Sequence, residues 1–330
     1  MFLECGVSEV GMAVVESESG ANGRVHRSDV RAARRRLSGL IRKTPVFHTT
    51  ITSPSGPVPV SLKLEYLQHG GSFKVRGSFN ALLEAGEQVE QVVIASSGNA
   101  GIAAALASAR LHKSCTVVVP ESAPHTKVAA MWSHGAEVLW HGTTYADALG
   151  YATELAAERS ALQLHAYDLP AVVAGAGVIG LELEEQVRGR PSVLAAVGGG
   201  GLIAGIAAAI GRRQHVIGVE PVGSPTLHAA LAANQPVDIG APTTAADSLG
   251  ASRIGDIAMD LSRRHHVRSL LVTDDAIVTA REYLWREFRV VVELAGAAAL
   301  GAVQSGVYVP EPDERPVVVL CGANTDLSAL

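Results

Sequence analysis

This 330-residue chain has few cysteines and few aromatic residues, and it has no excess of basic charge. Its three cysteines, Cys5, Cys115 and Cys321, have neither the paired spacing of a disulfide framework nor that of a zinc site. A reducing compartment suits such a chain, and we expect it to be cytoplasmic. The net charge of −5 argues against nucleic-acid and anionic-membrane partners, because neither attracts a mildly acidic protein.

Long apolar runs and a basic N-terminus are missing too. The one long uncharged stretch, residues 192–211, contains four consecutive glycines, which would weaken a membrane-spanning helix badly. Residues 1–23 hold no lysine or arginine, so they lack the basic start of a secretory leader. We therefore expect no membrane segment, and we expect residues 1–27 to form a flexible N-terminal extension.

Hydrophobic residues make up 48% of the chain, and they form short β-branched runs that alternate with alanine-rich helical patterns. The predicted strands are Gln91–Ser96, Cys115–Pro120, Ala136–Trp140, Leu162–Ala166, Ser192–Val197, His215–Glu220, Ser269–Thr273 and Pro316–Leu320. The predicted helices include Ala100–Arg110, Tyr145–Arg159, Ala171–Val187, Leu202–Ile210 and Asp275–Phe288. Apolar strands separated by helices indicate an α/β fold, in which a parallel sheet is covered on both faces.

Lys74 lies in a run of small and aromatic residues, Gly71-Ser72-Phe73-Lys74-Val75-Arg76-Gly77-Ser78, just after the strand-like segment Ser61–Leu67. A lysine in such a run can be partly desolvated, which lowers its pKa and makes its amine a nucleophile toward carbonyl carbon. A solvated surface lysine is the alternative, and two further segments argue against it.

The first is the glycine loop Gly198-Gly199-Gly200-Gly201, between a predicted strand and a predicted helix. Backbone N–H groups and the helix dipole make such a turn an anion site, most naturally for phosphate. A dinucleotide is an alternative ligand, because Gly199, Gly201 and Ala204 also fit the G-x-G-x-x-A fingerprint and Glu220 ends the next strand.

The second is the turn Ser96-Ser97-Gly98-Asn99, which leads from a strand into a helix. Its backbone donors could hold a carboxylate, Ser97 could move a proton, and Asn99 could bind a ligand oxygen; helix capping is the structural alternative. The segment Cys321-Gly322-Ala323-Asn324 follows the last strand. In parallel α/β folds ligands bind beyond the carboxyl ends of strands, so these turns could share one crevice.

Together these segments resemble the pyridoxal-phosphate (PLP) enzymes of the threonine/serine dehydratase family, which includes serine racemase-like members. The matching segments, in the family's order, are Ser72–Gly77, Ser96–Asn99, Gly198–Gly205, Gly218–Pro221 and Cys321–Asn324. The resemblance implies PLP fold type II, which is tryptophan synthase β-like, with two domains of open, mostly parallel twisted sheet flanked by helices. It implies a large PLP-binding domain of residues 28–90 and 169–330, a small mobile domain of residues 91–168, and a homodimer.

The resemblance also implies residue roles. Lys74 would bind PLP as a Schiff base, and Phe73 would lie near the cofactor. The remaining cofactor contacts would come from Asn99 at the position-3 oxygen, from Gly198, Gly199, Gly200 and Gly201 at the phosphate, and from Cys321 at the pyridine nitrogen. A neutral Cys321 thiol would leave that nitrogen largely unprotonated. The substrate carboxylate would bind to Ser96, Ser97, Gly98 and Asn99, with Ser97 on the face opposite Lys74.

The chain departs from the family pattern at three places. Ala100 stands where many of these dehydratases have histidine, and Leu294 replaces a proline in the segment Glu293–Ala297. Some members bind a divalent cation after the Gly-Val-Glu-Pro turn; here Glu220 remains, but Thr226 stands where a second carboxylate is expected. Hard cations prefer carboxylate oxygens, so we expect no metal site, with Glu220 as a weak candidate ligand.

The resemblance implies an ammonia-lyase (dehydratase) that converts a β-hydroxy amino acid such as L-threonine or L-serine to a 2-oxo acid and ammonia, through a Lys74 aldimine and an aminoacrylate. Since the chain stops soon after Cys321, we expect no C-terminal regulatory domain. The alternatives are a serine racemase that uses Ser97, a lyase for 3-hydroxyaspartate or another β-substituted amino acid, and a β-replacement synthase. From other classes, an NAD-binding oxidoreductase and a non-catalytic dimeric binding protein remain.

Overall fold

The computed structural model describes residues 24–189, 191–312 and 314–326. Most of the predicted N-terminal extension, residues 1–23, lies outside the described residues. The remainder of that extension leads into helix α1 (Arg27–Arg36).

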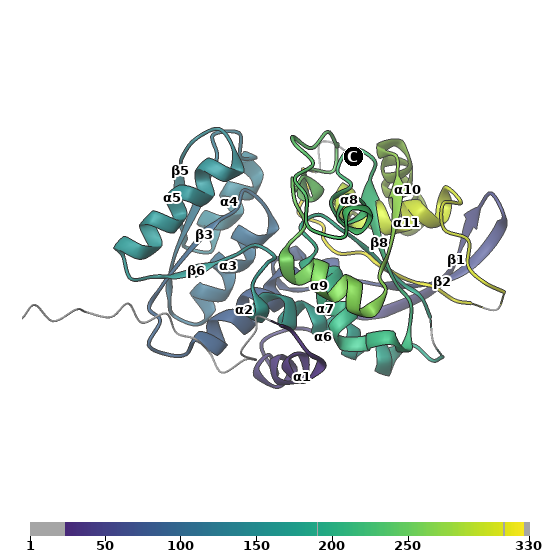
Figure 1. Ribbon diagram of the computed structural model, residues 1–330, viewed down its shortest axis with the longest axis horizontal. Coiled ribbons are helices and arrows are strands. Elements are labelled where there is room, and N and C mark those ends of the chain that lie inside the picture. The colour runs from purple at the N-terminus through teal and green to yellow at the C-terminus, as the bar shows by residue number, and fades with distance from the viewer. Residues whose placement is uncertain (1–23, 190, 313, 327–330) are drawn as a thin grey trace, which may run out of the picture.

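The chain forms two sheets that lie side by side along the long axis of the molecule (Figure 1). The small unit comprises β3 (Gln91–Ala95), α3 (Asn99–Arg110), β4 (Ser114–Val119), α4 (His125–Ser133), β5 (Glu137–Trp140), α5 (Tyr145–Glu158) and β6 (Leu162–Leu164). The large unit begins with α1, β1 (Val46–Ser53), β2 (Gly56–Lys63), η1 (Glu65–Leu67), η2 (His69–Gly71) and α2 (Lys74–Ala85). It continues after β6 with α6 (Pro170–Gln186), β7 (Val193–Ala196), α7 (Gly201–Ile210), η3 (Gly211–Arg213), β8 (Val216–Pro221), α8 (Thr226–Ala233), η4 (Asp247–Leu249), α9 (Asp256–His265), β9 (Arg268–Val272), α10 (Asp274–Phe288), α11 (Leu294–Gln304) and β10 (Val317–Val319).

The sheet of the small unit has four strands, all parallel, in the order β5-β4-β3-β6. Its strands are apolar on both faces, as expected for a parallel sheet between helices. Val93, Ala95 and Val118 form one apolar cluster with α5, whereas Val92 and Ile94 join the main core, to which α3 also contributes. The two-residue period of a strand explains this division, because successive side chains point to opposite faces.

The sheet of the large unit has six strands in the order β1-β2-β10-β7-β8-β9. Only the β1–β2 hairpin is antiparallel, and the other pairs are parallel. The prediction of an α/β fold with mostly parallel sheets flanked by helices is therefore confirmed. The boundaries of the two domains at residues 90/91 and 168/169 stay a prediction.

The strands predicted from the sequence differ from the structure at two places. The strand expected near Ser61–Leu67 runs instead over Gly56–Lys63, and a 3₁₀ helix follows at Glu65–Leu67. Its partner β1 was not predicted, because its exposed and buried positions alternate only at one end. Within the described residues, no helix is long and apolar enough to cross a membrane.

Candidate functional site

The segment that carries Lys74 pairs with the segment that follows the last strand. Ser72 and Gly322 form an isolated antiparallel bridge, and the Phe73 N–H donates to the Cys321 carbonyl at 3.0 Å. The Ala323 N–H donates back to the Gly71 carbonyl at 2.9 Å. Ser72 and Gly322, 250 positions apart in the sequence, are thereby fixed side by side.

Lys74 is the first residue of helix α2, and its side chain enters a low-dielectric surrounding. Its Nζ donates to the Ala166 carbonyl at 2.7 Å, just beyond the end of β6, and lies 5.3 Å from the centre of the Phe73 ring. Burial lowers the pKa of Lys74 to about 8, although the nearby Glu293 carboxyl acts in the opposite direction. Near pH 7, the fraction of molecules with a neutral amine is therefore larger for Lys74 than for an ordinary lysine. A nucleophile or a base needs this neutral form.

Asn99 is held from two sides by residues of the large unit. Its Nδ2 donates to Glu293 Oε1 at 2.5 Å, and its Oδ1 accepts from Asn324 Nδ2 at 2.8 Å. Asn324 Nδ2 also donates to the Gly70 carbonyl at 2.8 Å. An amide with one donor already bound keeps a second N–H, so Asn99 can still donate to the oxygen of a ligand.

The turn after β3 supplies backbone donors at the start of α3. The Ser96 hydroxyl is buried and accepts from the Gly98 N–H at 3.2 Å, while Ser97 is half-buried beside it. Gly98 is the N-cap of the twelve-residue helix α3. A carboxylate at this point would meet the positive end of the helix dipole, which is what the predicted substrate-carboxylate site of Ser96, Ser97, Gly98 and Asn99 needs.

The glycine loop connects β7 to α7 in a conformation that needs glycine. Gly200, the N-cap of α7, has φ +90° in the left-handed region, and a β-carbon on Gly199 would lie 2.4 Å from carbons of the Tyr167 ring. The loop thus presents bare backbone at a helix N-terminus, where side chains would fill the space. Such a cradle fits a phosphate group.

Cys321 is buried directly after β10, where its Sγ lies 3.5 Å from the Ala295 carbonyl. Burial raises the pKa of its thiol far above the ordinary value, and the nearby Glu293 carboxyl raises the pKa further. The thiol therefore stays protonated and neutral across the physiological range. The resemblance to the dehydratases implies such a neutral group for the residue that faces a pyridine nitrogen.

Glu220, the weak metal candidate, caps a helix. Its carboxylate accepts from the backbone N–H groups of Leu227 (2.7 Å) and His228 (2.9 Å) at the start of α8, and from the Ser269 hydroxyl (2.6 Å). The Thr226 hydroxyl lies 3.2 Å from Glu220 and donates to the Gly198 carbonyl at 2.7 Å. Among the described residues, no group of three or more His, Cys, Asp or Glu side chains could hold a metal ion.

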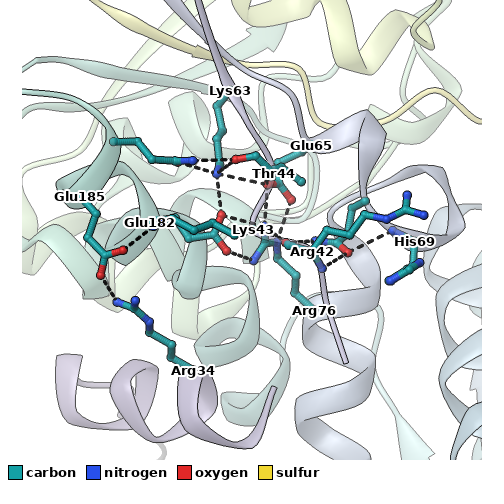
Figure 2. A network of polar contacts seen from close by, with 12 residues as sticks. Arg34, Arg42, Lys43, Thr44, Lys63, Glu65, His69, Arg76, Glu182 and Glu185 are labelled. Atoms are coloured by element: carbon teal, nitrogen blue, oxygen red, sulfur yellow. Dashed lines mark hydrogen bonds and ion pairs between the residues drawn. The ribbon is translucent and has the colours of Figure 1, made fainter. Parts of the chain in front are cut away.

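A buried ion-pair network holds Arg76 in the first turn of α2, and Figure 2 shows the residues of this network. Arg76 donates to both oxygens of Glu65 at 2.8 Å each, and to Glu182 Oε1 at 2.7 Å. Lys63 Nζ donates to Glu182 Oε2 at 2.5 Å. Burial alone would raise the pKa of Glu65, but Arg76 and Lys63 outweigh burial and the net shift is downward. The charged network thus fixes the helix whose first residue is Lys74.

Several polar residues of the site were not singled out from the sequence. Glu293 and Lys127 are almost completely buried, with exposed fractions of 3% and 5%, and both lie near Asn99 and Gly98. Ser248 hydrogen-bonds to both, and the Tyr167 ring packs against the glycine loop. Tyr167 follows a predicted strand, so the strand-end rule could have found it. Glu293 opens the family segment Glu293–Ala297, which pointed to it only indirectly, and no motif covers Lys127 or Ser248.

Substituting Gly199 with valine should weaken binding of the expected phosphate cofactor by about tenfold to a hundredfold, the effect of forcing side-chain atoms into a packed contact. The new β-carbon would collide with the Tyr167 ring and displace the loop. Fluorescence titration of the apoprotein with PLP measures the change. Gly150→Val is the matched control, because a β-carbon there has nothing within 4 Å. Unchanged affinity in Gly199→Val would remove the loop from the cofactor site.

Comparisons with known proteins agree with this geometry. The family described as pyridoxal-phosphate dependent enzymes matches residues 37–322. The chain is 36% identical to the catabolic L-threonine dehydratase TdcB of Escherichia coli (strain K12) over 306 residues, which cover 91% of this chain and 93% of that enzyme. It is 33% identical to a phenylserine dehydratase of Ralstonia pickettii over 306 residues, with coverages of 91% and 93%. The crystal structure of serine racemase from Dictyostelium discoideum matches with a TM-score of 0.83 at 30% identity, covering 92% of this chain and 99% of that one.

Proposed function

The chain belongs to the family of pyridoxal-phosphate dependent enzymes, and on this premise we propose that it is an ammonia-lyase acting on a β-hydroxy amino acid such as L-threonine or L-serine. The products would be a 2-oxo acid and ammonia. The observation that carries the proposal is the amine of Lys74, whose pKa burial lowers and which donates to the Ala166 carbonyl, next to the Tyr167 ring that packs against the glycine loop. The family also separates this chain from the NAD-binding oxidoreductases that its glycine loop resembles.

Each residue of the site has a proposed task. PLP, when bound, supplies an electron sink for the pair left on the α-carbon. The turn Ser96–Asn99 holds the substrate carboxylate, and the amine of Lys74 removes the α-proton. The β-hydroxyl then leaves as water by taking the proton that Lys74 has removed, and the resulting enamine reacts with water to give the 2-oxo acid and ammonia. The protonated Cys321 thiol adds no charge at the ring nitrogen, which suits loss of a β-substituent more than a long-lived carbanion.

A substrate panel tests the proposal. Purified enzyme loaded with PLP is assayed with L-threonine, L-serine, 3-hydroxyaspartate and phenylserine, and both the 2-oxo acid and the enantiomer of the remaining amino acid are measured. We expect oxo acid from at least one β-hydroxy substrate. No oxo acid from any of them, by an enzyme that shows normal cofactor absorbance, would contradict the proposal.

Racemisation of serine is the second candidate function, and Ser97 is the residue that favours it. Ser97 lies in the carboxylate turn, where a hydroxyl could return a proton to the face opposite Lys74. Ser97→Ala should therefore abolish racemisation of L-serine and turnover of D-serine. Elimination from an L-substrate should fall less, because it needs only the lysine face and a proton for the leaving group.

Both activities are measured on one preparation, with Lys74→Ala as the blank. Ser133→Ala is the matched control, because this exposed serine donates to the Ala130 carbonyl inside α4. Equal losses of elimination and racemisation in Ser97→Ala would mean that Ser97 only positions the substrate.

We also propose that the enzyme is a cytoplasmic homodimer. Support for a second copy comes from exposed aromatic residues such as Phe47, which packs edge-to-face on Phe288 with 5.6 Å between ring centres. Aromatic side chains are enriched in protein interfaces. Multi-angle light scattering on the PLP-loaded enzyme distinguishes a dimer from a monomer.

A further inference from the structure

A series of hydrogen bonds links α4 of the small unit to Asn99 of the same unit through two residues of the large unit, Ser248 and Glu293. Lys127 Nζ on α4 donates to Asp247 Oδ2 at 2.5 Å and to Ser248 Oγ at 3.2 Å. The Ser248 hydroxyl donates to Glu293 Oε2 at 2.9 Å, and Glu293 Oε1 accepts from Asn99. This series therefore ties the two units together at the candidate site.

Ser248 is the central residue of this series, because its hydroxyl both accepts and donates a hydrogen bond. Its oxygen accepts from Lys127 while its single proton goes to Glu293. Lys127 itself is 4.0 Å from Glu293, outside hydrogen-bonding distance. Among the described residues, the Ser248 hydroxyl is the group that hydrogen-bonds to both the buried ammonium of Lys127 and the buried carboxyl of Glu293.

Glu293 needs these partners because it is buried with few charges to balance it. Burial raises the pKa of its carboxyl, and Asp247 raises it further, while Lys127, Ser248 and Asn99 lower it. Glu293 in turn decides how the Asn99 amide lies. A carboxylate accepts but does not donate, so Nδ2 of Asn99 must face it and Oδ1 must face Asn324.

We propose that Ser248 is a positioning residue, whose hydroxyl joins Lys127 to Glu293 and so holds the Asn99 amide with its second N–H free for the cofactor. This inference rests on PLP as the cofactor of the proposed function. A fixed donor at Asn99 would favour negative charge on the cofactor oxygen that it binds, so these contacts would raise the affinity for PLP and change the pH dependence of its visible absorbance.

The test compares Ser248→Ala, which removes only the hydroxyl, with Ser248→Thr, which keeps one. The apoprotein is titrated with PLP, and the visible absorbance of the loaded enzyme is recorded from pH 6 to pH 10. One lost hydrogen bond of ordinary strength corresponds to about a fivefold weaker affinity. We expect about that loss in Ser248→Ala, together with a shifted pH midpoint of the visible band, and recovery of both in Ser248→Thr.

Lys127→Met provides an independent break of the same series and should shift the same pH midpoint in the same direction. Its control is Lys43→Met, since Lys43 pairs with Glu185 on the surface, away from these contacts. Thermal unfolding of each apoprotein shows whether a variant is folded.

Normal PLP affinity and a normal midpoint in folded Ser248→Ala would overturn the inference, as would a shift in Ser248→Ala that Lys127→Met does not share. These readouts involve no amino-acid substrate. Failure of the proposed function would instead be a loaded wild-type enzyme with normal absorbance and no turnover of any β-hydroxy amino acid.

Discussion

Replacement of Lys74 by alanine is expected to abolish covalent PLP binding and to lower turnover of any β-hydroxy amino acid by at least about 10²–10⁴-fold, the contribution of a positioned base alone. The variant removes the amine that reaches the Ala166 carbonyl and that burial keeps partly neutral. Oxo-acid formation and the visible absorbance of the purified protein measure the two losses. Lys113→Ala is the matched control, because Lys113 lies on the small unit and donates to the Gly86 carbonyl at the end of α2.

The attachment site can be read directly. Borohydride treatment of the loaded enzyme followed by peptide mapping should place the pyridoxyl group on Lys74. The other buried lysines, Lys63 and Lys127, are committed to Glu182 and Asp247. A pyridoxyl group on Lys63, Lys113 or Lys127, or a colourless protein that cannot be reconstituted, would refute the assignment.

The lowered pKa of Lys74 gives this prediction a pH dependence. Attack on the aldehyde of PLP needs the neutral amine, and at one pH unit below its pKa only about a tenth of an amine is neutral. With a pKa of about 8, the rate of cofactor capture by the apoprotein should rise up to that pH and level off above it. N-acetyl-lysine, whose amine has a pKa of about 10.4, should show a rate that rises further across the same range. Identical profiles would mean that Lys74 is solvated in the apoprotein.

Local patterns made most of the fold predictable. Each apolar run that precedes a glycine or serine turn is a parallel strand, because its side chains are buried on both faces and its turn starts a helix. One of the two errors lies where burial involves charge. The segment around Lys63 and Glu65 has no clear strand period, since the ion-pair network, and not apolar packing, decides which of its side chains are inside.

Some residues of the candidate site could likewise be predicted from the sequence, and others could not. Lys74, Asn99 and Cys321 are in segments whose order along the chain carries a family pattern, and a lone sequence can show that. Ser248 and Lys127 meet although 121 positions separate them, and Asn99 and Glu293 meet across 194 positions. Such contacts come from the way the two units pack, which no spacing along the sequence encodes.

Loss of Arg76 should cause the largest change in stability. Arg76→Met leaves the carboxylates of Glu65 and Glu182 buried with Lys63 as the main remaining cation. Removing one partner of a buried ion pair typically costs about 3–5 kcal/mol, because the other charge stays desolvated. We expect a loss of that size in the free energy of unfolding of the apoprotein, measured by urea titration at pH 7.

The neighbouring pair Arg34–Glu185 supplies the control (Figure 2). The two side chains meet at 2.5 Å but are 44% and 40% exposed, and an exposed pair contributes about 0–1 kcal/mol. Arg34→Met should therefore change stability by no more than that. Equal effects of the two substitutions would show that burial does not set the strength of these pairs.

The pH dependence separates charge from packing. The pKa of Glu65 is lowered in the folded protein, so its contribution is complete above its unfolded pKa and is lost as the pH falls through the folded value. Without Arg76 the same carboxyl should have a raised pKa, because burial is then the larger influence. The stability deficit of Arg76→Met should therefore shrink as the pH falls below the pKa that Glu65 has in the variant, since protonation neutralises the carboxyl that the missing guanidinium left unpaired. A deficit that stays constant from pH 7 to pH 4 would assign the loss to packing of the arginine side chain instead.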